Sequence, residues 1–365
     1  MSRIRYAEEL SRVVDGGLVE RTFGPGSPRS QRMARSLRFT VRRTVGLWRP
    51  TSRGIKLARL AFDPGQTWPP LGGTRFQTRK LGGVKVEWSV APRAAEHDVQ
   101  DRVILYFHGG GFVVGSPRTH RNLVSRLSHV TATPIASVDY GMVPEASIQA
   151  SRSDALAAYK GLIESGYPAE TIIVAGDSAG GNLAAYVALA AADRDLGLPA
   201  ALVLLSPWAD LTTVGGSRHA NAATEFFLAG DVLDRIARVL VPDEAERAAW
   251  PNSPINAPAE LLRLLPPTLI QVGADEALLD DGITLARRIG AAGGTVELQT
   301  YEGQGHVVAL WAGNVDARRA TREIAVWIDA ALPEGHGPGV PPDDVVEEAV
   351  DAQSPVDIAR QAFPG

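Results

Sequence analysis

The chain has 365 residues, a formal net charge of −4 and no cysteine, and 45% of its residues are hydrophobic. This length suits one large α/β domain with an added cap, whereas the lack of cysteine excludes a disulfide-stabilised scaffold. No apolar stretch approaches the roughly 18 residues that a membrane-spanning helix needs.

The N-terminal segment, residues 1–75, is strongly basic, and we expect it to form part of a cap. Residues 1–60 carry 14 Lys and Arg against 4 Asp and Glu, and residues 31–48 place arginines among apolar residues at roughly helical spacing. That pattern favours a cap helix whose apolar face covers a pocket, and contact with anionic lipid is a second interpretation. Nucleic-acid binding is disfavoured because no recognised nucleic-acid module accompanies the charge. The chain begins with charged residues rather than the apolar run of a secretory signal, so we expect a cytoplasmic protein, with membrane association as the alternative.

A triple-glycine motif, H-G-G-G-F, stands at residues 108–112 after the apolar run Val103–Phe107. Val103–Phe107 is typical of a buried strand, and the alternating Val84–Val90 before it of an edge strand. Three consecutive glycines leave backbone N–H groups uncovered by any Cβ, and such groups can bind a developing oxyanion. The alternatives are a flexible loop and a phosphate-binding turn. The phosphate turn is disfavoured because the lysine of a P-loop and the full dinucleotide fingerprint are both missing.

A second glycine motif, G-D-S-A-G at residues 176–180, lies between a β-branched run and an alanine-rich helical stretch, residues 182–192. This pattern predicts a serine on a sharp strand-to-helix turn, a nucleophile elbow, with Ser178 exposed to a cleft. Small neighbours are needed because the turn is strained and crowded. A packing turn alone is the alternative interpretation, but the two glycine motifs in this order favour a nucleophile with an oxyanion hole.

Strand-like and helical stretches alternate through the middle of the chain, which implies a parallel sheet. Residues 209–260 depart from that rhythm, and we expect them to complete the cap. Residues 333–365 are rich in Gly, Pro and acidic residues, which predicts a flexible tail. The remaining predicted strands are residues 134–139, 201–205, 268–272 and 296–301, and the predicted helices include 151–164 and 282–291.

A nucleophilic serine needs a base and an acid. In proteins whose serine stands on such a strand-to-helix turn, the order along the chain is Ser, then Asp or Glu, then His. Three histidines come after Ser178, namely His219, His306 and His336. His306 is the candidate base because it stands on a glycine-rich loop after a late strand. His219 precedes every plausible acid, and His336 lies in the tail.

The acid should follow the strand at 268–272, where Asp275 and Glu276 are adjacent. Neighbouring loop residues usually point in different directions, so one of the two is the partner of the histidine. Asp280 and Asp281 are better explained as the start of the next helix, where carboxylates favour the dipole. The residues themselves leave Asp275 and Glu276 both open.

Over residues 103–328 the chain resembles the hormone-sensitive-lipase-like esterases, bacterial family IV of the α/β-hydrolases. That resemblance implies a mostly parallel eight-stranded sheet flanked by helices, with a helical cap above the site. One departure is Gly141, which stands where the family commonly has arginine. The matching stretches are H-G-G-G-F at 108–112, D-Y at 139–140 with P-E at 144–145, G-D-S-A-G-G-N-L-A at 176–184 and S-P-W-A-D-L at 206–211.

The resemblance also implies roles for individual residues. The family motif Asp-Pro-Leu-x-Asp, laid on this chain without a gap, puts the triad acid on Glu276, so we favour Glu276 over Asp275. The oxyanion donors would be the backbone N–H groups of Gly110, Gly111 and Ala179. Phe112 and Trp208 are candidates for the substrate pocket, although buried packing explains Trp208 equally well. No metal or organic cofactor is required.

The function implied is a serine carboxylesterase that hydrolyses short- to medium-chain acyl esters through an acyl-enzyme intermediate. An amidase or deacetylase with the same triad is the alternative within enzymes. The second alternative is a non-catalytic small-ligand receptor on the same fold, like the gibberellin receptors that lack the triad histidine. Dimerisation is common in the family, but no feature of the sequence demonstrates a homodimer. We therefore predict a cap segment at 1–75, a catalytic domain at 76–332 with cap residues 209–260 inserted, and a tail at 333–365.

Overall fold

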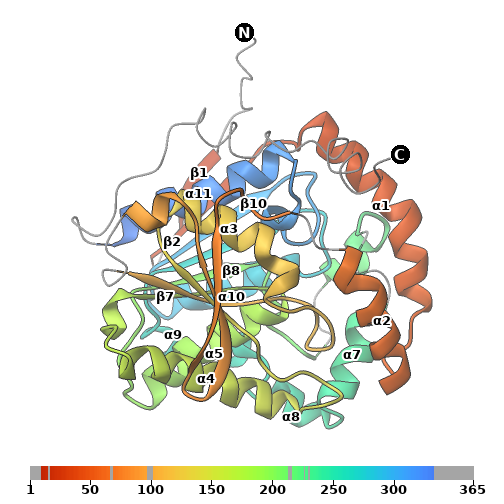
Figure 1. Cartoon of the computed structure of the whole chain (residues 1–365). Helices are drawn as coiled ribbons and strands as arrows, with labels where there is room; N and C mark the ends of the chain where they lie inside the picture. The colour runs from red at the N-terminus through yellow and green to blue at the C-terminus, as the bar shows by residue number, and fades with distance from the viewer. Residues whose placement is uncertain are drawn as a thin grey trace, which may run out of the picture.

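A single twisted sheet of ten strands forms the centre of the computed structural model (Figure 1), which describes residues 10–14, 17–65, 69–96, 102–212, 216–225, 227–228 and 231–332. The strand order is β1-β2-β10-β9-β8-β7-β5-β6-β4-β3, and the strands from β2 to β6 in this order run parallel. The strands are β1 (Leu10–Val14), β2 (Leu18–Phe23), β3 (Arg75–Leu81), β4 (Val84–Val90), β5 (Val103–Phe107), β6 (Ile135–Val138), β7 (Ile172–Asp177), β8 (Ala201–Leu205), β9 (Thr268–Gly273) and β10 (Val296–Tyr301).

Helices cover both faces of this sheet, and alternate residues of each central strand face opposite sides. In β5, Val103, Leu105 and Phe107 belong to one core, whereas Ile104 and Tyr106 belong to the other. The first core is completed by α4, α5 and α10, and the second by α3 and α11. The helices are α1 (Pro28–Leu47), α2 (Ser52–Gly65), α3 (Arg121–Val130), α4 (Ile148–Glu164), α5 (Ala179–Asp193), α6 (Ser217–Ala220), α7 (Val232–Leu240), α8 (Glu244–Ala248), α9 (Ala259–Leu262), α10 (Leu279–Ala291) and α11 (Val315–Ala331).

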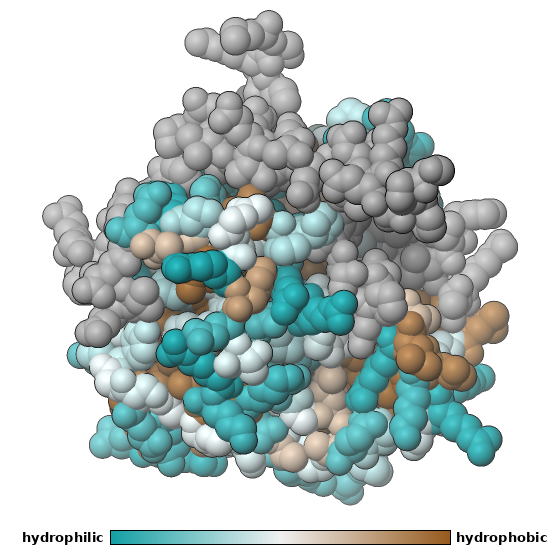
Figure 2. Space-filling model, viewed as in Figure 1, coloured by the Kyte–Doolittle hydropathy of each residue, from teal (hydrophilic) through white to brown (hydrophobic). Residues whose placement is uncertain are grey.

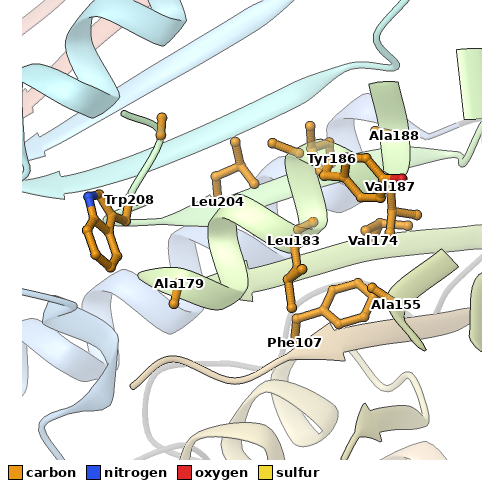
Figure 3. Close-up of a cluster of buried hydrophobic side chains, with 14 of the residues drawn as sticks. Phe107, Ala155, Val174, Ala179, Leu183, Tyr186, Val187, Ala188, Leu204 and Trp208 are labelled. Atoms are coloured by element: carbon orange, nitrogen blue, oxygen red, sulfur yellow. The ribbon is translucent and has the colours of Figure 1, made fainter. Parts of the chain in front are cut away.

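Helix α5 packs at the centre of the first core because its sequence is almost entirely small and aliphatic. Figure 3 shows Leu183 and Val187 of α5 among Phe107 of β5 and Leu204 of β8, all of them buried. The helix follows β7 directly, so its close packing fixes the turn that joins the two elements. The position of that turn is therefore determined by the best-packed part of the molecule.

The sheet has ten strands where eight were predicted, because β1 and β2 add an antiparallel pair at its edge. β2 pairs in parallel with β10 from Leu18 opposite Val296 to Phe23 opposite Tyr301. The rings of Phe23 and Tyr301 stack with centroids 4.6 Å apart. This part of the segment 1–75 thus belongs to the sheet rather than to the cap.

We propose that α1 and α2, together with elements from residues 209–260, form the cap, because side chains from both regions line one cavity. Figure 1 shows α1 and α2, in red and orange, along one side of the molecule, with α7 near α2. Residues 31–47 of the predicted helix lie within α1, and Trp48 caps its end. Arg235 of α7 donates hydrogen bonds to the carbonyls of Trp48 and Gly46, and the indole N–H of Trp48 donates to the carbonyl of Gly54 at 2.9 Å. These contacts join the end of α1 to both α2 and α7.

Two further predictions concern helices and termini. Among the helices of the described ranges, none is long and apolar enough to cross a membrane. The tail at 333–365 lies outside the described residues.

Candidate active site

Ser178 occupies the turn between β7 and α5 with φ 53° and ψ −119°, in a region that L-residues rarely adopt. Its backbone N–H donates to the carbonyl of Leu205 on the neighbouring strand at 2.9 Å. A Cβ added to Gly180 would lie 2.0 Å from the carbonyl oxygen of Phe107, and one added to Gly176 would lie 2.3 Å from the carbonyl oxygen of Gly180. Only glycine fits at these two positions, which explains the G-x-S-x-G spacing.

His306 lies beside Glu276. The distance from His306 Nδ1 to Glu276 Oε2 is 3.4 Å, and both side chains are buried. Ser206 supports this pair, because its Oγ donates to Glu276 Oε2 at 2.7 Å and accepts from the backbone N–H of Val307 at 3.0 Å. One hydroxyl therefore fixes both the carboxylate and the loop that carries the imidazole. The sequence signal for Ser206 was its place at the start of the S-P-W-A-D-L stretch, to which no role was given.

The pKa of His306 reflects its burial and its neighbour. Burial by itself lowers the pKa of the imidazole, but the hydrogen-bonding contact and the negative charge of Glu276 outweigh burial and raise it above the ordinary value of 6.5. A raised pKa means that the carboxylate stabilises the imidazolium, which is the species formed when the ring accepts a proton.

Asp275 points away from His306. Its Oδ2 lies 3.5 Å from Nη2 of Arg38 on α1, and the side chain is 30% exposed. Asp280 accepts from the backbone N–H of Ser217 at 2.7 Å at the start of α10. The adjacent carboxylates at 275 and 276 thus face opposite sides of their loop, and Glu276 is the one next to the imidazole.

Gly110 and Gly111 line the same cavity as Ser178 and have φ values of 122° and 64°. A Cβ on Gly110 would lie 2.0 Å from the carbonyl oxygen of Val114, so the tight loop requires glycine. Ala179 begins α5 and is fully buried. Within the described ranges, the backbone N–H groups of these three residues have no hydrogen-bond acceptor. They are therefore free to receive an oxyanion.

Asp177 connects the nucleophile turn to the glycine loop. Its Oδ1 accepts from the hydroxyl of Tyr106 at 2.7 Å and from the backbone N–H of Gly109 at 3.0 Å. Its Oδ2 lies 3.4 Å from Nε2 of His120, and both of these side chains are buried. Burial raises the pKa of Asp177, but the charge and hydrogen bond of His120, the hydroxyl of Tyr106 and the charge of His108 bring it below the ordinary value. A Cβ on Gly109 would lie only 2.2 Å from Asp177 Oδ2, so the first glycine of the motif permits this close approach.

The cavity above Ser178 has a volume of about 510 Å³ and walls that are mainly apolar. Trp208 is buried and lines it. Phe112 does not: its buried ring packs against Tyr140 and Trp208, with centroids 6.4 Å away in each case. The φ of 61° at Phe112 turns the chain here, so the side chain enters the core instead of the cavity. From the cap the lining residues are Val45, Trp48, Leu57, Ala58, Ala61, Phe227, Leu228, Val232, Leu233 and Ile236.

Arg59 of α2 is a contact that the sequence did not reveal. Its Nε donates to the carbonyl of Val113 at 2.7 Å, its Nη2 to the carbonyl of Val143 at 2.8 Å, and its Nη1 to Glu145 Oε2 at 2.8 Å. The arginine that the family commonly has at position 141 is replaced here by glycine. Arg59 supplies a guanidinium to the same loop from the cap instead.

A family model described as alpha/beta hydrolase fold matches residues 104–310. An acetyl-hydrolase of Streptomyces hygroscopicus is 35% identical over 301 residues, which are 81% of this chain and 97% of that protein. The carboxylesterase/phospholipase LipF of Mycobacterium tuberculosis is 33% identical over 86% of this chain and 85% of its own length.

Solved structures agree with these relatives. A hormone-sensitive lipase from a metagenome library superposes with a TM-score of 0.76 at 32% identity, covering 85% of this chain and all of that one. The esterase EstE5, soaked with p-nitrophenyl butyrate, gives 0.75 at 28% identity over 84% of this chain and 99% of its own. By its sequence, fold and site, the chain belongs to the hormone-sensitive-lipase-like esterases of the α/β-hydrolase superfamily and is a serine ester hydrolase.

Proposed function

We propose that the chain hydrolyses carboxylic esters with short to medium acyl chains through an acyl-enzyme intermediate on Ser178. The observation that carries this proposal is the placement of His306, 3.4 Å from Glu276, on the wall of the cavity that Ser178 also lines. Ser178, His306 and the glycine loop line this one cavity, and Glu276 lies next to His306.

In the first half-reaction Ser178 Oγ attacks the ester carbonyl while His306 accepts the hydroxyl proton. The carbonyl π electrons move onto the oxygen, and the backbone amides of Gly110, Gly111 and Ala179 stabilise the resulting oxyanion. Glu276 holds the imidazole in the tautomer that has its free nitrogen toward the serine and stabilises the imidazolium. The tetrahedral intermediate then expels the alcohol, which takes the proton from His306.

In the second half-reaction water enters after the alcohol has left. His306 takes a proton from the water as its oxygen attacks the acyl carbonyl, and the same amides stabilise the second oxyanion. Collapse returns the proton from His306 to Ser178 Oγ and releases the carboxylic acid. The enzyme is regenerated with no change in oxidation state and no group left over.

The walls of the cavity support a preference for short to medium acyl chains. A volume of about 510 Å³ with an apolar lining suits a small hydrophobic ester. Cap side chains such as Trp48 and Ile236 line the same cavity as Ser178, and we expect them to limit the length of acyl chain that fits. Acetyl and butyryl, the acyl groups named for the acetyl-hydrolase relative and for the soak of the solved esterase EstE5, are both short.

A series of p-nitrophenyl esters from acetate to palmitate tests the proposal. We expect kcat/KM to be highest for acetate to octanoate and to fall for longer chains. The matching p-nitroanilides measure amidase activity, which we expect to be far lower. Highest turnover of palmitate, or of the anilides, would contradict the proposed substrate class.

A further inference from the structure

The cap segment carries an unbalanced positive charge. Residues 24–62 contain ten arginines and lysines and no acidic residue. Within the described side chains, Arg38 and Arg59 are engaged with Asp275 and Glu145 of the main domain. Arg49, Arg53 and Lys56 are exposed instead, and they follow one another around the start of α2.

Exposed leucines accompany these cations. Leu47 at the end of α1 is 83% exposed, and Leu57 and Leu60 on α2 are 66% and 75% exposed. At 100° per residue, Arg53, Lys56, Leu57 and Leu60 fall within one third of the helix circumference. Figure 2 shows hydrophobic atoms next to hydrophilic ones in the area where Figure 1 places α2. Large leucines that are this exposed often mark a surface that binds a partner.

The opposite face of α2 is anchored to the protein. Ile55 is buried, and Arg59 donates to the carbonyls of Val113 and Val143. Ala58 and Ala61 line the cavity, and so does the exposed Leu57. The exposed face therefore borders the mouth of the cavity, and whatever covers this face also lies next to the route by which an ester enters.

We propose that the cap-helix surface, made of Leu47, Arg49, Arg53, Lys56, Leu57 and Leu60, docks on an anionic lipid bilayer. The leucines enter the boundary between headgroups and acyl chains, while the long basic side chains extend to lipid phosphates. The mouth of the cavity then faces the bilayer, so esters dissolved in the membrane reach Ser178 without crossing water. This last step rests on the proposed esterase function, whereas the docking itself does not.

The charge of this surface favours a bilayer over a second copy of the chain or a nucleic acid. In a symmetric dimer this surface would meet its own copy, which would bring like charges together. A nucleic acid would neutralise the cations but would leave the leucines in water. An anionic bilayer satisfies both kinds of side chain at once.

Flotation with vesicles tests the docking, using Ser178→Ala so that binding is measured without turnover. We expect binding to vesicles of phosphatidylcholine with phosphatidylglycerol, and little binding to phosphatidylcholine alone. The triple variant Arg49→Gln/Arg53→Gln/Lys56→Gln should reduce the bound fraction by roughly tenfold or more. The matched control, Lys80→Gln/Lys160→Gln/Arg263→Gln, removes three exposed cations from other elements and should change it less than about twofold.

The leucines have their own matched pair. We expect Leu47→Ser/Leu60→Ser to weaken vesicle binding several-fold and Leu198→Ser/Leu264→Ser, which alters exposed leucines elsewhere, to leave it unchanged. Turnover of soluble p-nitrophenyl butyrate, measured in the same substitutions with Ser178 retained, reports whether each variant is folded. Equal binding to neutral vesicles, equal losses in variants and controls, or a concentration-dependent dimer in place of binding would overturn the proposal. If the protein binds anionic vesicles but cleaves no ester, the docking stands and the proposed function fails.

Discussion

Two sides of the cavity are built in different ways. We call the side that carries Ser178, His306 and the glycine loop the floor, and the side formed by α1, α2 and α7 the roof. In the floor, buried polar groups hold one another: Ser206 binds Glu276, and Asp177 binds the amide of Gly109. In the roof, formed by the cap helices, arginines such as Arg59 reach backbone carbonyls of other elements, and apolar side chains such as Ile55 pack against the core. Catalytic groups need fixed geometry, whereas a roof needs only to enclose and to be apolar. Substitutions in the floor should therefore lower kcat, and those in the roof should act more on KM.

The largest effect is expected from the two adjacent carboxylates of the acid loop. Glu276→Gln should lower kcat by about ten thousand-fold because the imidazole loses the charge that orients and stabilises it. Asp275→Asn, the matched control one residue away, should change kcat less than about tenfold because its contact is the partly exposed Arg38 and not the imidazole. Steady-state kinetics on p-nitrophenyl butyrate measure both, and equal losses would contradict the assignment of Glu276.

A second floor prediction concerns the approach of the glycine loop to Asp177. Gly109→Ala places a Cβ about 2.2 Å from Asp177 Oδ2, so the loop must move and the oxyanion donors with it. We expect kcat to fall by about a hundredfold or more with little change in KM. Gly72→Ala, where a Cβ meets nothing within 4 Å, is the control and should be silent. An unchanged kcat in Gly109→Ala would contradict the claim that catalysis depends on the position of the glycine loop.

Arg59 joins the roof to the floor, so its removal should affect both kcat and KM. Arg59→Ala should lower kcat/KM by about tenfold, because Val113 follows the oxyanion glycines and loses its charged donor. Arg59→Lys should recover part of the loss, since it keeps the charge and one donor but lacks the fork. Arg53→Ala on the same helix is the control for soluble substrate. A loss in Arg59→Ala confined to thermal stability would reduce this residue to a packing role.

The smallest effect is a shift of the pH profile. Catalysis needs neutral His306, and its pKa is raised above 6.5, so kcat/KM should reach half its maximum above that pH. In Glu276→Gln the raising contact is lost while burial remains, so the residual activity should titrate at lower pH. The same raised pKa stabilises the fold most at acidic pH, below the ordinary imidazole pKa, and this contribution is lost as the pH rises through the raised value. If kcat/KM of the unaltered enzyme reached half its maximum below pH 6.5, the pairing of His306 with Glu276 would be contradicted.

The sequence predicted the floor far better than the roof and the sheet edge. Glycine spacing around Ser178 reports a local steric need, so it can be recognised without a structure. The pairing of Leu18 with Val296 joins distant residues and has no local signature, which explains why β2 was not predicted. Phe112 was misplaced because its direction depends on a positive φ. Arg59 was missed because one arginine among many gives no sign of which carbonyls it will meet.

Identification of the acylated residue tests the central claim most directly. Wild-type enzyme is mixed with p-nitrophenyl butyrate, quenched in acid within the first turnover, digested and examined by mass spectrometry. We predict one butyryl group on Ser178, whose yield is lost in Ser178→Ala. A butyryl group on another residue, or full ester turnover by Ser178→Ala, would contradict the account.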